Sequence, residues 1–195
     1  TVVKESDSLR HLGEIMREND LKSVPVVDKE EQLVGIVTVS DLAQRYFKEL
    51  SMQNLADAGV SFRDVIRVID GEAIVNGDEG GKIRGNVRIA AGSINMIQDV
   101  IKEHDVVLIG DRRDETLIDC LKQGIDCMIV TGNGRISAGV IEEAEARHML
   151  IINTPYDTYT CARLINQCVP VKRIMQKELI AFKPLDLLSD IKGTM

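Results

Sequence analysis

Hydrophobic and polar positions in residues 1–50 predict a small unit of strands and helices. Thr1–Val3 is a β-branched start that predicts a strand. Leu9, Leu12, Ile15 and Met16 then recur at helical spacing, after Asp7 or Ser8 as the N-cap. The pattern next predicts a hairpin and a second helix: strands over Ser23–Val27 and Leu33–Thr38, the polar turn Lys29-Glu30-Glu31-Gln32, and a helix opened by Ser40-Asp41 that runs through Leu42, Tyr46 and Leu50.

Residues 51–168 follow a different pattern. Glycines recur through the first half of this segment. They predict turns and short strands around Ala73–Val75 and Val87–Ala90. From Ile94 onward strands and helices alternate: helices over Ile94–Lys102, Glu115–Gln123, Gly139–Arg147 and Tyr156–Gln167, and strands over Val106–Ile109, Cys127–Thr131 and Met149–Asn153. Continuous apolar strands between amphipathic helices indicate a parallel sheet that is covered on both faces.

Residues 169–195 begin the first pattern again. Val169-Pro170-Val171 leads to Ile174-Met175, Leu179–Phe182 predicts a strand, and Pro184–Met195 predicts a helix. We interpret this as an internal repeat that is interrupted by a large insert and cut short in its second copy. Because Thr1–Val3 also resembles a strand already under way, we expect the chain to be a fragment of a longer protein.

Charge and aromatic content argue against a nucleic acid or a membrane as the partner. The net charge is −7, made up of −3 in residues 1–50, −6 in residues 51–168 and +2 in residues 169–195. No region is strongly basic, as a surface for duplex DNA or anionic lipid would be. Aromatic residues make up 3% of the chain and Trp is absent, which disfavours base stacking. A small anionic ligand remains compatible with this charge, because a few local cations suffice to hold it.

The cysteines and the lack of targeting segments indicate a cytoplasmic protein. No run approaches the length of a membrane span, and the N-terminus carries no signal peptide pattern. The cysteines form no CxxC pair and have apolar or helical neighbours, which predicts buried, reduced thiols: Cys120, Cys127, Cys161 and Cys168.

Two patterns with possible chemistry fail on their spacing. The stretch from Asn76 to Lys82 lacks the first glycine of a phosphate loop, and Ile83 stands where such a loop needs Ser or Thr. The three histidines, His11, His104 and His148, have no ligand spacing with one another or with the cysteines, so no metal site is expected in this chain.

Two family resemblances organise the sequence. Residues 1–50 resemble a CBS motif in Lys22-Ser23-Val24-Pro25-Val26-Val27-Asp28 and, more specifically, in Leu33-Val34-Gly35-Ile36-Val37-Thr38-Val39-Ser40-Asp41-Leu42. Residues 169–195, with Lys172-Arg173-Ile174-Met175, resemble the start of a second CBS motif. Residues 51–168 resemble a DRTGG domain in Gly110-Asp111-Arg112, Ile129-Val130-Thr131-Gly132 and Thr154-Pro155-Tyr156-Asp157-Thr158, although Arg113 departs from the pattern of the family's name.

This order of domains is similar to the regulatory insert of family II, manganese-dependent inorganic pyrophosphatases. The resemblance implies an α/β fold, in which α+β CBS motifs (1–50 and a truncated 169–195) flank a parallel-sheet DRTGG domain (51–168). It implies a homodimeric module that binds AMP or ADP as inhibitors and ATP or a diadenosine polyphosphate as activators. The manganese ions and the catalytic residues would belong to other domains of the parent protein, so the chain itself would hold no cofactor and no catalytic residue.

A nucleotide cleft in the first CBS motif needs three kinds of contact. Val3, Val24 and Pro25 are candidates for an apolar slot around the base, and the Thr1–Val3 backbone for reading its edge. Asp41 suits the ribose, because a carboxylate accepts two hydroxyl bonds and would repel a phosphate. The phosphate would meet Thr38, Lys22 and the free N–H groups of the helix that opens at Ser40-Asp41. Simple N-capping is the alternative role of Ser40-Asp41.

Further candidates lie in the second motif and in the insert. Lys172 and Arg173 could face the phosphates, or could be ordinary surface charges. Asp111 and Arg112 follow a buried strand, at the position where open α/β sheets bind ligands. Thr131 and Thr154 lie at the corresponding ends of two other predicted strands. The alternative there is turn chemistry, with the domain serving as a spacer or dimer contact.

Three other functions remain open from the sequence. The chain could be a free-standing α/β enzyme that uses the crevice of Asp111, Thr131 and Thr154. It could also be an interaction module that holds a dimer together without nucleotide. A third possibility is a sensor in another host, such as a transcriptional regulator or an acyltransferase.

Overall fold

The computed structural model describes residues 1–48, 55–90, 100–110 and 113–179. The N-terminal unit, residues 1–48, consists of β1 (Val3–Lys4), α1 (Leu9–Glu18), β2 (Ser23–Val27), β3 (Leu33–Thr38) and α2 (Val39–Lys48). Its sheet has the order β1-β2-β3, with β1 parallel to β2 and β2 antiparallel to β3. The predicted hairpin is therefore confirmed.

Helix α1 forms where the sequence predicts it. The Ser8 side chain accepts a hydrogen bond from the His11 N–H and caps the first turn. Leu9, Leu12 and Met16 are buried on one face of the helix, which packs against the sheet.

The central unit, residues 55–168, contains a five-stranded sheet. Its strands are β4 (Glu72–Val75), β5 (Val87–Ala90), β6 (Val106–Ile109), β7 (Cys127–Thr131) and β8 (Leu150–Thr154), in the order β4-β8-β7-β6-β5. Strands β5 to β8 are parallel, but β4 is antiparallel to β8. The prediction of a parallel sheet is therefore correct for β5 to β8 and wrong for β4. Strand β4 lies at one edge of the sheet, next to β8, and runs in the opposite direction.

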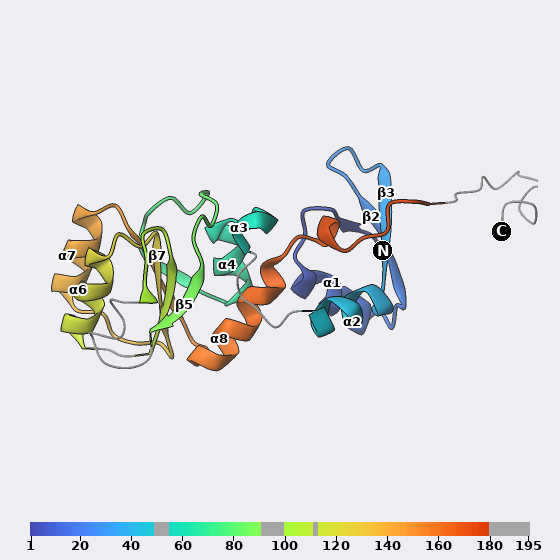
Figure 1. Cartoon of the computed structure of the whole chain (residues 1–195). Helices are drawn as coiled ribbons and strands as arrows, with labels where there is room; N and C mark the ends of the chain where they lie inside the picture. The colour runs from blue at the N-terminus through green and yellow to red at the C-terminus, as the bar shows by residue number, and fades with distance from the viewer. Residues whose placement is uncertain (49–54, 91–99, 111–112, 180–195) are drawn as a thin grey trace, which may run out of the picture.

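Helices cover both faces of this sheet, as predicted (Figure 1). On one face lie α6 (Asp114–Lys122) and α7 (Ala138–Ala146), and on the other lie α4 (Phe62–Val68) and α8 (Thr158–Ile165), with the short α3 (Leu55–Ala58) beside α4. Alternate residues of β6 divide between the two cores: Val107 and Ile109 pack with α6, and Val106 and Leu108 pack on the α4–α8 side. All four residues are fully buried, which explains the continuous apolar run.

The two units share one hydrophobic core. Leu9 and Leu12 of α1 belong to the same buried cluster as Phe62 and Ile165 of the central unit. The chain leaves α8 through the 3-10 helices η2 (Asn166–Cys168) and η3 (Val171–Arg173) and returns to the N-terminal unit. There Ile36 and Gln176 exchange both main-chain hydrogen bonds, at 3.1 and 2.9 Å. The start of the second repeat therefore lies against β3.

Close packing at Gly35 fixes this contact. A Cβ atom at Gly35 would lie 2.8 Å from the Met175 sulfur and 2.9 Å from the Gln176 carbonyl oxygen. Only glycine allows the segment around Met175 to approach β3 so closely.

Several predicted elements differ from the structure. Helices α3 and α4 were missed, because the glycines nearby suggested only strands and turns. The predicted helices at 115–123, 139–147 and 156–167 begin and end within about two residues of α6, α7 and α8, except that η2 completes the last one. The predicted helix at 94–102 falls mostly on residues outside the described ranges, as do the strand at 179–182 and the helix at 184–195. Among the helices of the described ranges, none is long and apolar enough to cross a membrane.

Candidate functional site

The corner between β3 and α2 is built around Thr38 and Asp41. The Asp41 carboxylate accepts hydrogen bonds from the Thr38 N–H at 2.8 Å and from the Thr38 hydroxyl at 2.7 Å. The Thr38 hydroxyl in turn accepts from the Asp41 N–H at 3.3 Å. These bonds form a capping box in which Thr38 is the N-cap. The prediction that Ser40-Asp41 opens the helix was therefore wrong: α2 begins at Val39, and Ser40 is an exposed residue of its first turn.

Asp41 also contacts the second repeat. The Gln176 side-chain amide donates to both carboxylate oxygens, at 3.1 and 3.3 Å. Partial burial of Asp41 works to raise its pKa, but the hydrogen bonds from Thr38 and Gln176 outweigh it, and the pKa is lower than that of an ordinary Asp. The carboxylate is therefore ionised at neutral pH, and among the described residues its Oδ1 atom accepts a bond from Gln176 alone. A ligand hydroxyl could replace that amide.

A hollow of about 250 Å³ opens beside this carboxylate. Asp41, Gln44 and Arg45 line one side of it, and Arg173 and Ile174 of the second repeat line the other. The fold thus brings together two of the predicted residues, Asp41 and Arg173, that are far apart in the sequence.

Lys22 and Lys172, two further phosphate candidates, do not line this hollow. Lys22 is exposed, and its carbonyl oxygen accepts a hydrogen bond from the Val39 N–H at 3.0 Å. Its main chain therefore borders the first turn of α2. Lys172 lines a neighbouring hollow.

The predicted base slot needs a correction. Val24 and Val3 are 0% and 2% exposed, and their side chains lie in the core with α1. Successive side chains of a strand point to opposite faces, so Val24 and Pro25 cannot line the same slot. Pro25 is paired with Ile36 across the hairpin, on the face that also carries Thr38. Sequence reasoning missed Ile36, although strand alternation alone would have found it.

Thr1 and Val3 can contribute only in part to that slot. Thr1 is exposed and precedes β1, which begins at Val3. Because the Val3 side chain is buried, this segment can offer a ligand main-chain groups but no apolar side chain from Val3.

In the central unit, the strand-end threonines serve the fold. The Thr154 hydroxyl donates to the Ile69 carbonyl oxygen at 2.6 Å, and the Thr131 hydroxyl bonds that of Thr158 at 2.8 Å. Both threonines are buried. Asp111 and Arg112 lie outside the described residues. The threonine hydroxyls are therefore engaged within the protein, as the turn-chemistry alternative requires.

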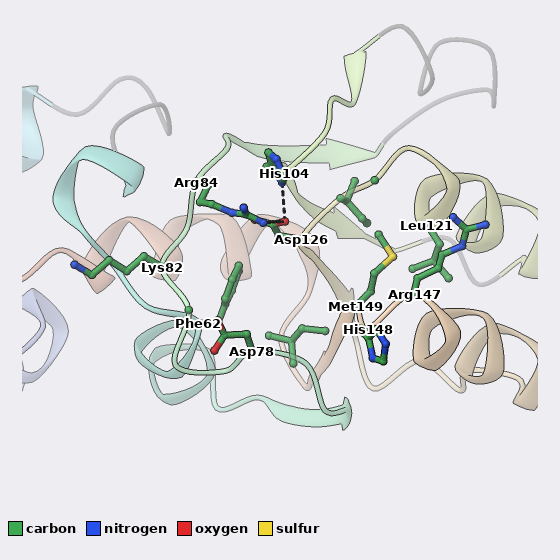
Figure 2. Close-up of a pocket in the computed structure, with 14 residues that line it drawn as sticks. Phe62, Asp78, Lys82, Arg84, His104, Leu121, Asp126, Arg147, His148 and Met149 are labelled. Atoms are coloured by element: carbon green, nitrogen blue, oxygen red, sulfur yellow. Dashed lines mark hydrogen bonds and ion pairs between the residues drawn. The ribbon is translucent and has the colours of Figure 1, made fainter.

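A larger cavity, of about 810 Å³, lies at the opposite, amino-terminal ends of β6, β7 and β8 (Figure 2). Its polar wall is internally paired: Asp126 accepts two bonds from Arg84, at 2.9 and 2.7 Å, and lies 3.0 Å from His104 Nδ1. Figure 2 shows Lys82 pointing away from this cavity. The cations around it therefore do not converge on one point.

Neither a metal centre nor a reactive thiol is evident in the part of the chain that the structure describes. No group of three or more His, Cys, Asp or Glu side chains gathers there as a metal site would require. All four cysteines are free and buried, as predicted. Burial raises the pKa of the Cys127 and Cys168 thiols well above its ordinary value, and that of Cys161 to about 12.

We therefore expect the four thiols to resist alkylation in the folded protein. Iodoacetamide reacts with thiolates, which the raised pKa of Cys127, Cys161 and Cys168 disfavours at neutral pH, and burial shields Cys120 from the reagent. Peptide mapping by mass spectrometry should find Cys120, Cys127, Cys161 and Cys168 unlabelled in buffer and fully labelled in urea. Rapid native labelling of any of the four would contradict this packing.

Comparison with known proteins identifies both units. Residues 1–48 match the CBS domain and residues 64–168 match the DRTGG domain. The CBS match contains the corner of Thr38 and Asp41, and the DRTGG match contains the whole five-stranded sheet. Because the latter match covers more than half of the chain, the chain belongs to the DRTGG domain family.

Two curated relatives that align with most of the chain are inorganic pyrophosphatases. The chain is 32% identical over 189 residues to the cobalt-dependent inorganic pyrophosphatase of Clostridium perfringens, covering 96% of this chain and 34% of that protein. It is 30% identical over 178 residues to the probable manganese-dependent inorganic pyrophosphatase of Thermotoga maritima, covering 91% of this chain and 32% of that protein. The chain thus spans about a third of the length of these curated relatives.

A solved structure of known function matches the chain along its whole length. It contains the CBS and DRTGG domains of the regulatory region of Clostridium perfringens pyrophosphatase, in complex with the activator diadenosine tetraphosphate. The TM-score is 0.92 at 31% sequence identity, and the match covers 100% of this chain and 85% of the other. The chain is therefore homologous to that regulatory region, and the predicted fold class is confirmed.

Proposed function

We propose that this chain is the adenine-nucleotide-sensing regulatory region of an inorganic pyrophosphatase. The observation that carries the proposal is the match of the entire chain, at a TM-score of 0.92, to a regulatory region whose structure holds diadenosine tetraphosphate. A nucleotide would bind in the N-terminal unit, at the corner of β3 and α2.

The geometry of the corner supports each part of this binding mode. The Asp41 carboxylate would accept the two ribose hydroxyls in place of the Gln176 amide. Pro25 and Ile36 would lie against the base on the open face of the sheet. In the first turn of α2, Ser40 would offer donors to the first phosphate, with Lys22 nearby. The Thr38 hydroxyl would join them by exchanging its bond to Asp41 for one to the phosphate.

Regulation would follow because Asp41, the proposed ribose ligand, is hydrogen-bonded to Gln176 of the second repeat. The nucleotide would replace a contact between the N-terminal unit and the second repeat, and so favour one arrangement of the two repeats over another. The effect on the attached catalytic domains is limited by the difference in nucleotide affinity between the two arrangements. We propose inhibition by AMP and ADP and activation by ATP or a diadenosine polyphosphate.

The whole protein would hydrolyse pyrophosphate with manganese or cobalt bound in catalytic domains outside this chain, as the names of its relatives suggest. We also propose that it is a cytoplasmic homodimer. Neither a nucleic acid nor a membrane is expected as a partner, given the net charge of −7.

The test is binding and activity of the full-length protein. AMP should bind, as measured by calorimetry, and should lower the rate of manganese-dependent pyrophosphate hydrolysis. Absence of binding heat with AMP, ADP and diadenosine tetraphosphate alike would refute the proposal. A stable dimer whose hydrolysis rate ignores all three nucleotides would favour the alternative of a nucleotide-independent interaction module.

A further inference from the structure

A cation-lined hollow lies where the central unit meets the start of the second repeat. It has a volume of about 570 Å³. The central unit contributes Lys82 and the small residues of α3 and Gly59, and the second repeat contributes Lys172, Arg173 and Lys177. Figure 2 shows that Lys82 points away from the cavity of the central unit, toward the side where the N-terminal unit lies. We call this hollow the junction hollow.

The charge of the junction hollow is opposite to that of the chain. Four cations line it against the two carboxylates of Glu5 and Asp57, whereas the chain as a whole carries a net charge of −7. Within the described ranges, Lys82, Lys172 and Lys177 form no ion pair, and the Arg173 guanidinium donates to the main-chain carbonyl of Asp57. Positive charges that line a concave surface repel one another, and together they produce a strong positive potential in the hollow. Such a surface favours an anion with several charges.

The junction hollow is linked to the candidate nucleotide site by shared lining residues. A further hollow of about 330 Å³, lined by Arg45, Asp57, Ala58, Val169 and Arg173, lies between them. It shares Arg45 and Arg173 with the hollow beside Asp41 and shares Asp57, Ala58 and Arg173 with the junction hollow. Arg173 therefore lines all three hollows, from the one beside the Asp41 carboxylate to the junction hollow.

We propose that the junction hollow binds a linear chain of three or more phosphates. The phosphates could come from a nucleotide bound at Asp41, and this part of the proposal rests on the proposed function. Free inorganic polyphosphate is the other source of the same chemistry. The phosphate of a monophosphate at Asp41 would lie at the first turn of α2, beside the hollow that Arg173 lines. The distal phosphates of a longer chain would extend past Arg173 toward Lys172, Lys177 and Lys82. Because Lys82 belongs to the central unit and the others to the second repeat, the ligand would join the two units.

The experiment compares three anions by calorimetry on the full-length protein, without divalent cations so that hydrolysis is prevented. The anions are AMP, ATP and inorganic tripolyphosphate. Replacing Lys82 by Ala should weaken ATP and tripolyphosphate binding about fivefold, and adding Lys177→Ala should bring the loss to about twentyfold. AMP affinity should change by less than about twofold. Lys82→Arg should keep wild-type affinity, and higher salt should reduce the difference between ATP and AMP.

Lys29→Ala is the matched control, because it removes an exposed lysine of the N-terminal unit whose ion pair, within the described ranges, is with its neighbour Glu30. It should leave all three affinities unchanged. Unchanged ATP and tripolyphosphate affinities in the Lys82→Ala/Lys177→Ala variant would overturn the inference, even if AMP binds. Conversely, tripolyphosphate binding that depends on Lys82 while AMP fails to bind would refute the nucleotide site and keep the junction hollow. If Asp41→Ala lost affinity for ATP but kept affinity for tripolyphosphate, a bound nucleotide would be one source of the phosphates in the junction hollow.

Discussion

Replacing Asp41 with Ala is expected to weaken AMP binding to the full-length protein about a hundredfold. Hydrogen bonds to a charged group contribute about 1.5–3 kcal/mol each, and the ribose would form two, partly offset by loss of the Gln176 bond. A net loss of about 3 kcal/mol corresponds to two orders of magnitude in the dissociation constant. Calorimetry with AMP measures this directly. With 2′,3′-dideoxy-AMP, which lacks both hydroxyls, wild type and variant should bind with similar affinity.

The chain offers a closely matched control in Asp64. Asp64 forms the same capping box with Ser61 at the start of α4, where its carboxylate accepts from the Ser61 hydroxyl at 2.6 Å. Asp64→Ala should therefore cost stability as Asp41→Ala does, about 1 kcal/mol, yet leave AMP affinity unchanged. If both variants lost AMP binding equally, the loss would reflect helix capping, and the ribose role of Asp41 would be wrong.

The comparison of sequence and structure separates local from non-local information. The hairpin of β2 and β3 and the helix capped by Ser8 were predictable because their signals lie within a few residues. The antiparallel addition of β4 to β8 was not, since no pattern within Glu72–Val75 specifies a partner that follows it by more than 70 residues. Helix α4 was predictable in principle from Ser61 and Asp64, but the surrounding glycines drew the interpretation toward strands.

The candidate site divides in the same way. Asp41 and Thr38 could be selected from their spacing. The helix cap was nevertheless predicted at Ser40-Asp41 and not at Thr38, because serine and threonine are both good N-cap residues. The error on Val24 was avoidable, since alternation along a strand separates it from Pro25. No local pattern could bring Lys82 to Lys177, or Gln176 to Asp41. Those contacts depend on how the chain returns from the central unit to β3.

Asp105→Ala is expected to lower the free energy of unfolding by about 3–5 kcal/mol, the largest stability effect we predict. Asp105 is 1% exposed and connects the start of β6 to two neighbouring segments. Its carboxylate accepts from the Asn86 N–H at 2.8 Å, the Lys102 N–H at 2.9 Å and Arg88 Nε at 3.4 Å. Alanine would leave these donors without their acceptor in a buried position, and an unsatisfied buried donor costs about 1–3 kcal/mol.

Urea unfolding followed by circular dichroism measures this loss, and two further variants show its origin. Asp105→Asn keeps the shape and one acceptor oxygen, so a smaller loss of about 1–3 kcal/mol is expected. Asp119→Ala removes a carboxylate that pairs with Lys122 at 3.4 Å on the surface of α6, and should change stability by no more than about 0.5 kcal/mol. An Asp105→Ala protein as stable as the Asp119→Ala protein would mean that water or a rearranged main chain satisfies the donors. In that case the Asp105 carboxylate would not be what holds β5 and the segment before β6 in place.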